Sequence, residues 1–220
     1  MKNRKSPNQR QREVLDLTSK KASSLVYFDN FELFFCILSG FNQSLKFNVA
    51  RSNEAFNFFP LLTGGFSWSG LSFEIPRRLL MITEKIMDTN NIRNYLEYNS
   101  MKAVQRYLSG DWGEENEFEE ILVDQGLGKG LMWESTSYII FFFWLKIDKG
   151  KFHESDTGII KLFQIRDAYD YSLAALYGHV LKVYKGILQR NLPSAKSAVD
   201  EGIRFCEKND LKLHEFAFRL

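Results

Sequence analysis

The chain has 220 residues, of which 45% are apolar and 25% are charged, and its formal net charge is +2. These ordinary values exclude a disordered or fibrous protein, and they lack the strong positive charge typical of nucleic-acid binding. Aromatic residues make up 15% of the chain, with 20 Phe, whereas only 4 residues are Pro. Many bulky apolar residues and few helix breakers predict a helical protein with a large core.

The first predicted element is a basic head, residues 1–24. Seven basic residues stand against Glu13 and Asp16, a net charge of +5, which leaves −3 for the rest of the chain. We expect a flexible, solvated tail. An arm for nucleic acid or an anionic membrane is the alternative, but the aromatic stacking partners that it needs begin only at Tyr27. The basic residues are Lys2, Arg4, Lys5, Arg10, Arg12, Lys20 and Lys21.

Residues 25–58 predict one or two helices, with the sequences VYFDNFELFFCIL and SLKFNVARSNEAFNFF. The apolar run 25–41 contains Asp29 and Glu32 and is expected to be a buried helix. Pro60 and Thr63-Gly64-Gly65 should then break the chain before Pro76 opens another helix. We interpret this region as an earlier hairpin of the array described below.

No secretory signal or membrane span is predicted. The basic head is not followed by an uninterrupted apolar segment and a small-residue cleavage site. The densest apolar run, Tyr138 to Leu145, has eight residues, whereas a bilayer span needs roughly 20. Cys36 and Cys206 are far apart, which does not indicate a disulfide framework. We therefore expect a cytoplasmic protein without a membrane partner.

Three short turns recur at intervals of 40 residues. They are Gly110-Asp111-Trp112, Gly150-Lys151-Phe152 and Arg190-Asn191-Leu192. The segments before the turns keep apolar residues in the same columns, a broad face of helical period that must be covered on two sides. The columns are Met101/Phe141/Leu181, Ala103/Phe143/Val183, Val104/Trp144/Tyr184 and Tyr107/Ile147/Ile187.

The segments after the turns predict a second helix in each unit. They begin with acidic residues or Pro, which suit the first turn of a helix. Gly158 and Ala198 share a column where neighbouring helices could approach closely. Their other apolar positions are Phe118, Ile121 and Leu122; Ile159, Ile160, Leu162 and Phe163; and Ala195, Val199 and Ile203. Each unit is thus a helical hairpin, and hairpins in series bury what one hairpin cannot.

These hairpins resemble degenerate tetratricopeptide repeats. The segments YLSGDWGEENEFEEIL, KIDKGKFHESDTGIIKLF and ILQRNLPSAKSAVDEGI carry the likeness, which covers the chain from Phe66 onward. Gly110-Asp111-Trp112 matches the Gly-Asp-aromatic turn of that family well, and the other two turns match it less closely. The period is 40 rather than 34 residues. This longer form is similar to helical arrays in large bacterial signalling proteins, between an ATPase module and a sensor, kinase or cyclase module.

Residues 211–220 begin a further apolar helical pattern that stops without a cap. The end of a repeat array needs a polar outer face. We interpret the bare ending as a cut from a longer array or as a surface that pairs with a partner, and oligomerisation through this helix is possible.

Few residues suggest chemistry. Val123–Gly130 superficially suggests a phosphate loop, but Val123 and Gly130 stand where the motif needs Gly and Ser or Thr. We expect an inter-repeat loop with C-cap glycines. His153, His179 and His214 lack ligand-type partners at metal-binding spacing and are interpreted as surface or satisfied core residues. The aromatic columns around Trp144 and Tyr184 are interpreted as core rather than as a ligand box.

A dense acidic cluster follows Gly110. It favours a solvated helix face, with a docking patch for a basic segment such as the chain's own head as the alternative. The patch residues are Glu114, Glu115, Glu117, Glu119 and Glu120, beside Asp111.

Together these patterns predict an all-α protein with residues 25–220 forming a tetratricopeptide-like α-solenoid of four to five hairpins. No catalytic, metal-binding or cofactor-binding residue is predicted. The expected function is a non-catalytic interaction or regulatory scaffold of a bacterial signalling system that binds a peptide or a neighbouring domain on its concave face, without nucleic acid. A small-molecule-sensing segment of a split ATPase, cyclase or kinase protein is the alternative. The contact candidates, expected to be exposed, are Asn99, Lys102, Arg106, His179 and Lys182.

Overall fold

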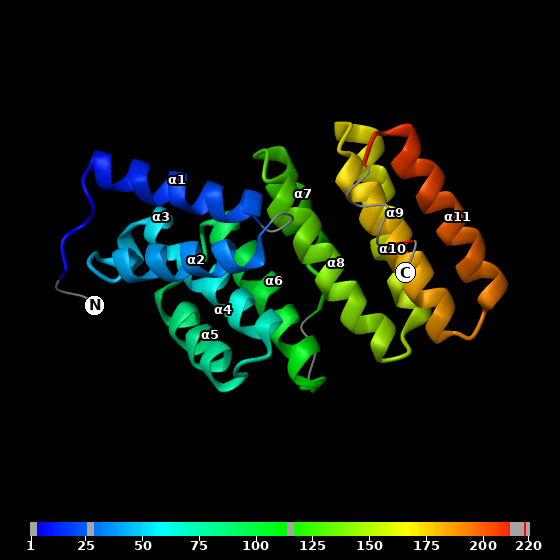
Figure 1. The fold of residues 1–220 in the computed structure, drawn as a ribbon, viewed down its shortest axis with the longest axis horizontal. Helices are drawn as coiled ribbons and strands as arrows, with labels where there is room; N and C mark the ends of the chain where they lie inside the picture. Colours follow the sequence, from blue (N-terminus) through cyan, green and yellow to red (C-terminus); the bar gives the residue numbers. More distant parts are fainter. Residues whose placement is uncertain (1–3, 26–28, 114–116, 212–217, 219–220) are drawn as a thin grey trace. The chain divides into compact units, whose positions relative to one another are not determined.

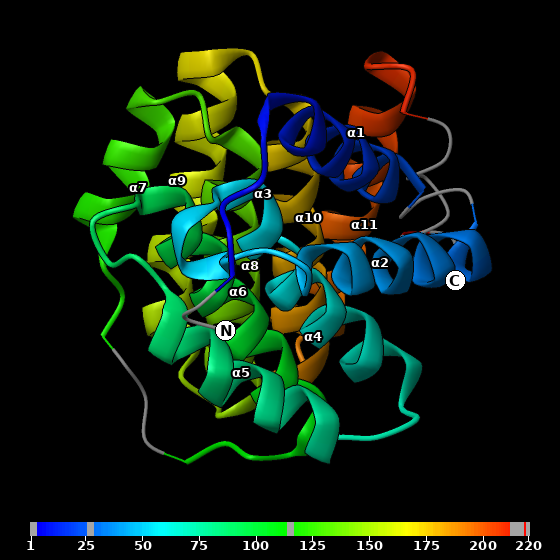
Figure 2. The same ribbon diagram turned by 90° about the vertical axis from the view of Figure 1, so that its left-hand side faces the viewer.

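A computed structural model describes residues 4–25, 29–113, 117–211 and 218. Helices and turns make up these residues, with no strand among them, which confirms the all-α class. The chain divides into two compact units, Met1–Gly113 (unit 1) and Glu114–Leu220 (unit 2). Figures 1 and 2 show the helices of each unit.

Unit 1 contains helices of unequal length. They are α1 (Gln9–Leu25), α2 (Asn30–Ser44), the 3-10 turn η1 (Val49–Arg51), α3 (Asn53–Phe56), α4 (Phe58–Ser69), α5 (Glu74–Ile86) and α6 (Ile92–Ser109). α1 packs along α2, and α4 contacts α2, α5 and α6 (Figure 2). α4 is therefore the helix around which unit 1 is organised.

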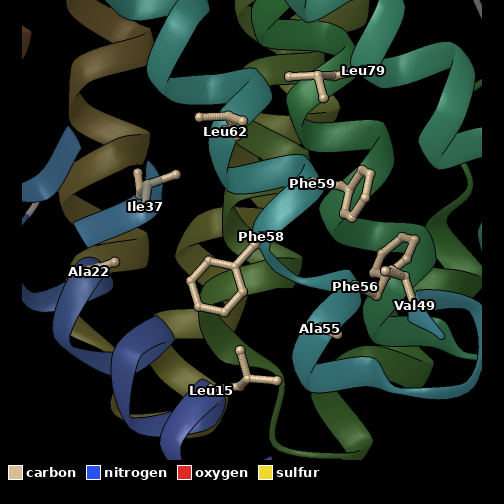
Figure 3. Close-up of a cluster of buried hydrophobic side chains, with 10 residues drawn as sticks. All are labelled: Leu15, Ala22, Ile37, Val49, Ala55, Phe56, Phe58, Phe59, Leu62 and Leu79. Atoms are coloured by element: carbon tan, nitrogen blue, oxygen red, sulfur yellow. The ribbon is translucent and has the colours of Figure 1, made fainter. Parts of the chain in front are cut away.

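The core of unit 1 gathers apolar side chains from α1 to α5 and from η1 (Figure 3). Phe56, Phe58 and Phe59 are essentially fully buried at its centre. A Cβ at Gly40 of α2 would lie 2.0 Å from Cε1 of Phe58, so only glycine lets the two helices approach this closely. The other members are Leu15, Ala22, Ile37, Val49, Ala55, Leu62 and Leu79.

Residues 9–25 form α1 rather than the flexible head that the sequence analysis expects. The helix starts at a reciprocal cap, because Asn8 Oδ1 accepts the backbone N–H of Gln11 while Gln11 Oε1 accepts that of Asn8, both at 2.9 Å. Leu15 and Ala22, seven residues apart, share the buried face. Exposed basic residues on the other faces produce the net charge without preventing the helix from packing.

The run 25–41 is only partly buried. Asp29 caps α2 by accepting the N–H of Glu32 at 2.8 Å. Ile37 faces the core, but Phe31 and Phe35 are 81% and 67% exposed. The expectation of a buried helix is therefore wrong for one face of α2, because the core of unit 1 lies on the other face.

The second helix predicted before residue 60 is replaced by η1 and the short α3. Ser52 has an extended backbone, with φ −147° and ψ 111°, and its hydroxyl accepts the N–H of Ala55 at 3.3 Å. Serine competes with helix continuation by capping the backbone in this way. A new helix therefore starts after Ser52 instead of running through it.

Pro60 and Thr63-Gly64-Gly65 lie inside α4, so the predicted chain break there is wrong. Pro60 falls in the first turn, where its missing N–H costs no helical hydrogen bond. Thr63 turns its hydroxyl onto the carbonyl of Phe59 at 2.9 Å. A Cβ at Gly64 would lie 2.7 Å from Sδ of Met101 on α6, so the glycine serves helix packing. The helix predicted to open at Pro76 is α5, with Pro76 in its first turn.

Unit 2 consists of helices at regular intervals. They are α7 (Glu120–Gly128), α8 (Met132–Asp148), α9 (Phe152–Tyr169), α10 (Ser172–Leu188) and α11 (Leu192–Lys208). The last four begin 20 residues apart. Each helix contacts the next one, and α8 also contacts α10 (Figure 1). The boundary between the units falls between α6 and α7, inside the first predicted hairpin.

Left-handed residues end these helices at the same interval. Positive φ angles occur at Gly110, Gly130, Gly150, Asp170, Arg190 and Asp210, and also at Gly70. Four of the ends share one hydrogen bond: the N–H of the following residue donates at 2.9 Å to the carbonyl four residues before the turn residue, as in Lys151 to Lys146 and Asn191 to Gly186. Helices end at all three turns that the sequence predicts.

Close helix approach accompanies the predicted small-residue column. A Cβ at Gly158 of α9 would lie 2.0 Å from the Phe143 ring of α8, and Ala198 of α11 is buried. The helix after Gly110 departs from prediction, because α7 begins at Glu120 rather than near Glu114.

Candidate functional site

The first helices of two predicted hairpins, α8 and α10, contact each other through an aromatic and polar group. The rings of Trp144 and Tyr184 meet edge to face with centroids 5.5 Å apart. The Tyr184 hydroxyl donates to Asp148 Oδ1 at 2.6 Å. Burial raises the pKa of Asp148, and the hydrogen bond from Tyr184 lowers it in part. The rings contact each other as core residues do, in line with the prediction for this column.

His179 is buried, so the prediction of an exposed contact residue is wrong. Its ring lies between Phe163 of α9 and Phe205 of α11, at centroid distances of 5.0 and 5.4 Å. Burial lowers the pKa of His179 to about 4, and Lys182 lowers it further than Glu201 raises it. Nδ1 is 4.0 Å from Glu201 Oε2 and makes no hydrogen bond. A neutral imidazole therefore packs between α9, α10 and α11.

Lys182 also faces the second helices of the hairpins. Its ammonium lies 4.8 Å above the Phe163 ring centroid and 3.4 Å from Glu201 Oε2. The side chain is partly exposed, and an anionic partner group could reach it. The two candidates on α10 thus share one face, but only Lys182 is available for contact.

Asn99, Lys102 and Arg106 share α6 in unit 1, and all three are half-buried. Asn99 donates its amide to the carbonyl of Tyr95 at 2.9 Å, and Arg106 Nε donates to the carbonyl of Asp111 at 3.3 Å. Lys102 lies 5.6 Å above the ring of Tyr98. Asn99 and Arg106 therefore make local contacts, and Lys102 resembles Lys182 in resting over an aromatic ring.

The acidic patch is described only in part, because Glu114 and Glu115 lie outside the described residues. Glu117 and Glu119 are exposed. Glu120 and Asp124 of α7 hold Lys161 of α9 between them, at 2.8 and 2.7 Å. Burial alone would lower the pKa of Lys161, but the two carboxylates raise it overall. Glu120 therefore ties α7 to α9, a role that the sequence did not indicate.

The remaining sequence candidates occupy structural positions. Most of Val123–Gly130 is helical in α7, and Gly130 is the left-handed residue at its end. The prediction of a loop there is therefore wrong. Within the described ranges, no group of three His, Cys, Asp or Glu residues is arranged to hold a metal ion. The Cys36 thiol lies 3.5 Å from the carbonyl of Thr18, and burial raises its pKa.

The predicted C-terminal helix is described at one residue, Phe218. It is buried with Leu176 and Cys206, while 212–217 and 219–220, including His214, lie outside the described residues. Among the helices that are described, none combines the length and apolar character needed to cross a bilayer.

Comparisons of the chain with protein-family models, curated proteins and solved structures find no match. The tetratricopeptide resemblance therefore stays a prediction. The function has to be argued from the helices and side chains themselves.

Two features of the site escaped the sequence analysis. The burial of His179 has a signal, since Leu176, His179, Val183 and Gly186 recur at helical spacing on the face of α10 toward α11. The exposed apolar residues at the end of α10 have a weaker one, because the same columns contain buried residues in α8.

Proposed function

We propose that the chain is a non-catalytic protein-interaction scaffold of a bacterial signalling system that acts in the cytoplasm and binds a peptide or a neighbouring domain. The observation that carries the proposal is the repeated geometry of unit 2. Helices start and left-handed turns recur every 20 residues, and the first helices α8 and α10 lie against each other. An array of about 40-residue hairpins built in this way offers a continuous helical surface to a partner.

The contact chemistry that we propose is the recognition of acidic side chains. Lys102 rests over Tyr98 and Lys182 over Phe163. A ring beneath an ammonium restricts where the charge lies and leaves its outer side open to a carboxylate. Each lysine would therefore present a positioned positive charge on the surface of its own unit.

The test measures binding of the full chain and its charge-reversal variants. A partner is recovered by affinity capture, purified, and its dissociation constant determined by calorimetry. We expect Lys102→Glu or Lys182→Glu to weaken binding at least tenfold, about 1.4 kcal/mol. The matched controls are Lys85→Glu and Lys208→Glu, which reverse exposed charges elsewhere in each unit. Unchanged binding of every recovered partner by both test variants would refute the proposal.

A further inference from the structure

The ends of α8 and α10, 40 residues apart, have the same backbone but different exposure. Both helices have 17 residues, and each ends in a left-handed residue, Gly150 or Arg190. Ile147 is fully buried, whereas its counterpart Ile187 is 50% exposed. Leu188 and Leu192 beside it are 41% and 67% exposed. We call these three exposed residues, together with Lys196, the α10–α11 end.

The corresponding end of α8 and α9 is covered by α10. Tyr184 contacts the ring of Trp144 and donates to Asp148, both on α8. The next residue, Lys185, donates to Asp156 of α9 at 2.6 Å. Two consecutive residues of α10 therefore dock on the two helices of the preceding hairpin, one through a ring and a hydroxyl and the other through a charge.

Moving the same positions forward by 40 residues changes their chemistry. Asp148 becomes Leu188, and Asp156 becomes Lys196, which is exposed on α11. A helix docking here in the manner of α10 would therefore meet an apolar side chain in place of a hydrogen-bond acceptor. It would also meet an ammonium in place of a carboxylate.

We propose that the α10–α11 end docks a helix of another protein, which lies on it as α10 lies on α8 and α9 and presents an apolar residue to Leu188 followed by Asp or Glu to Lys196. The inference rests on the proposed function, since it names a class of partner for the helical array. A second copy of this chain fits poorly as the occupant. Its α10 would bring Lys185 against Lys196, and like charges at an interface disfavour association.

The experiment uses two synthetic peptides with the sequence of residues 171–189. Both carry Tyr184→Leu, and one also carries Lys185→Glu. A lactam staple between positions 179 and 183 holds each peptide helical; in the folded chain these positions pack toward α11, outside the proposed docking face. Circular dichroism verifies the helix, and fluorescence anisotropy with the full chain at low salt measures binding.

We expect the glutamate peptide to bind at least tenfold more tightly than the lysine peptide. Lys196→Glu in the chain should reverse this order, and Leu188→Asp should abolish binding of both peptides. Lys208→Glu is the matched control and should leave both affinities unchanged. Because these residues are exposed, the variants should stay folded, which circular dichroism checks.

Two results would overturn the inference. The first is the absence of binding by either helical peptide, or the same peptide order with Lys196 and with its glutamate variant. The second is self-association of the chain that Leu188→Asp disrupts, seen by analytical ultracentrifugation, without peptide binding, which would assign the surface to a second copy. Charge reversal at Lys102 or Lys182 should not affect peptide binding. A partner lost by those variants but retained by Leu188→Asp would support the proposed function and refute this inference.

Discussion

Unit 1 and unit 2 are both helical, but they are organised differently. In unit 2, α8 to α11 start every 20 residues and each contacts the next. In unit 1, η1 and α3 interrupt the chain between two longer helices, and α4 contacts three neighbours. Regular helix lengths let one turn geometry repeat, whereas irregular lengths require a core that joins unequal pieces.

The core residues of the two units reflect this difference. Phe56, Phe58 and Phe59 bring three aromatic rings from adjacent positions into the core of unit 1. In unit 2 the burial follows helical faces, and it includes a polar ring, His179, that has no counterpart in unit 1 because residues 1–113 contain no histidine. The comparison predicts that unit 1 depends on single large side chains, and that the stability of unit 2 depends on pH and on its turns.

The largest effect is expected in the core of unit 1. Phe58→Ala removes a fully buried ring and should lower the free energy of unfolding by about 3–5 kcal/mol, measured by denaturant titration followed by circular dichroism. Phe31→Ala is the matched control in the same unit, and because its ring is exposed the change should stay within about 0.5 kcal/mol. Equal losses from both substitutions would show that the core is not centred on Phe58.

A smaller effect is expected from the pH dependence of unit 2. The pKa of His179 is about 4 in the folded chain and 6.5 unperturbed. Below pH 6.5 the unfolded state binds a proton that the folded state does not, so stability falls as the pH drops toward 4. At 1.36 kcal/mol per pKa unit the loss is about 3 kcal/mol.

The measurement compares denaturant unfolding between pH 7 and pH 4 for the chain and for His179→Leu. The variant should have the flatter profile, because it removes the proton-binding difference and keeps an apolar group between Phe163 and Phe205. His153→Gln replaces an exposed histidine as a control and should follow the unsubstituted chain. Parallel profiles for the chain and for His179→Leu would mean that the imidazole is not buried as a neutral group.

Much of unit 2 could be predicted from the sequence because its signals are local. Gly150 marks a helix end by its freedom to adopt a positive φ, and the apolar columns before it follow helical spacing. Unit 1 was predicted less well because its signals compete. Net charge obscured the cap at Asn8 and Gln11 that starts α1, and Pro60 and Gly64 resembled breaks although packing places them inside α4.

The candidate site could be predicted only as a list of helices and polar residues. Lys182 was placed on the correct helix, but its position over Phe163 depends on a contact between α9 and α10 that no local pattern specifies. His179 was expected to be exposed because the residue is polar. Its burial depends on rings supplied by Phe163 and Phe205, which are distant in sequence and become neighbours only when the helices pack.

The smallest effect tests whether the turns of unit 2 are equivalent. Gly150 and Arg190 both have positive φ, 73° and 56°, a region that costs a residue with a side chain roughly 1–2 kcal/mol. Arg190→Gly should therefore raise the free energy of unfolding by about 0.5–1 kcal/mol after the greater entropy of glycine in the unfolded chain is included. Gly150→Ala should lower it by about 1 kcal/mol, both measured by denaturant titration.

Gly128→Ala is the control for glycine removal as such. Gly128 lies in α7 with open space around its Cα, so alanine there should be neutral or stabilising by up to about 1 kcal/mol. Opposite signs at positions 150 and 128 would locate the effect in the left-handed backbone. If Arg190→Gly is instead destabilising, its side chain contributes contacts that Gly150 lacks, and the turns after α8 and α10 share a backbone shape without being interchangeable.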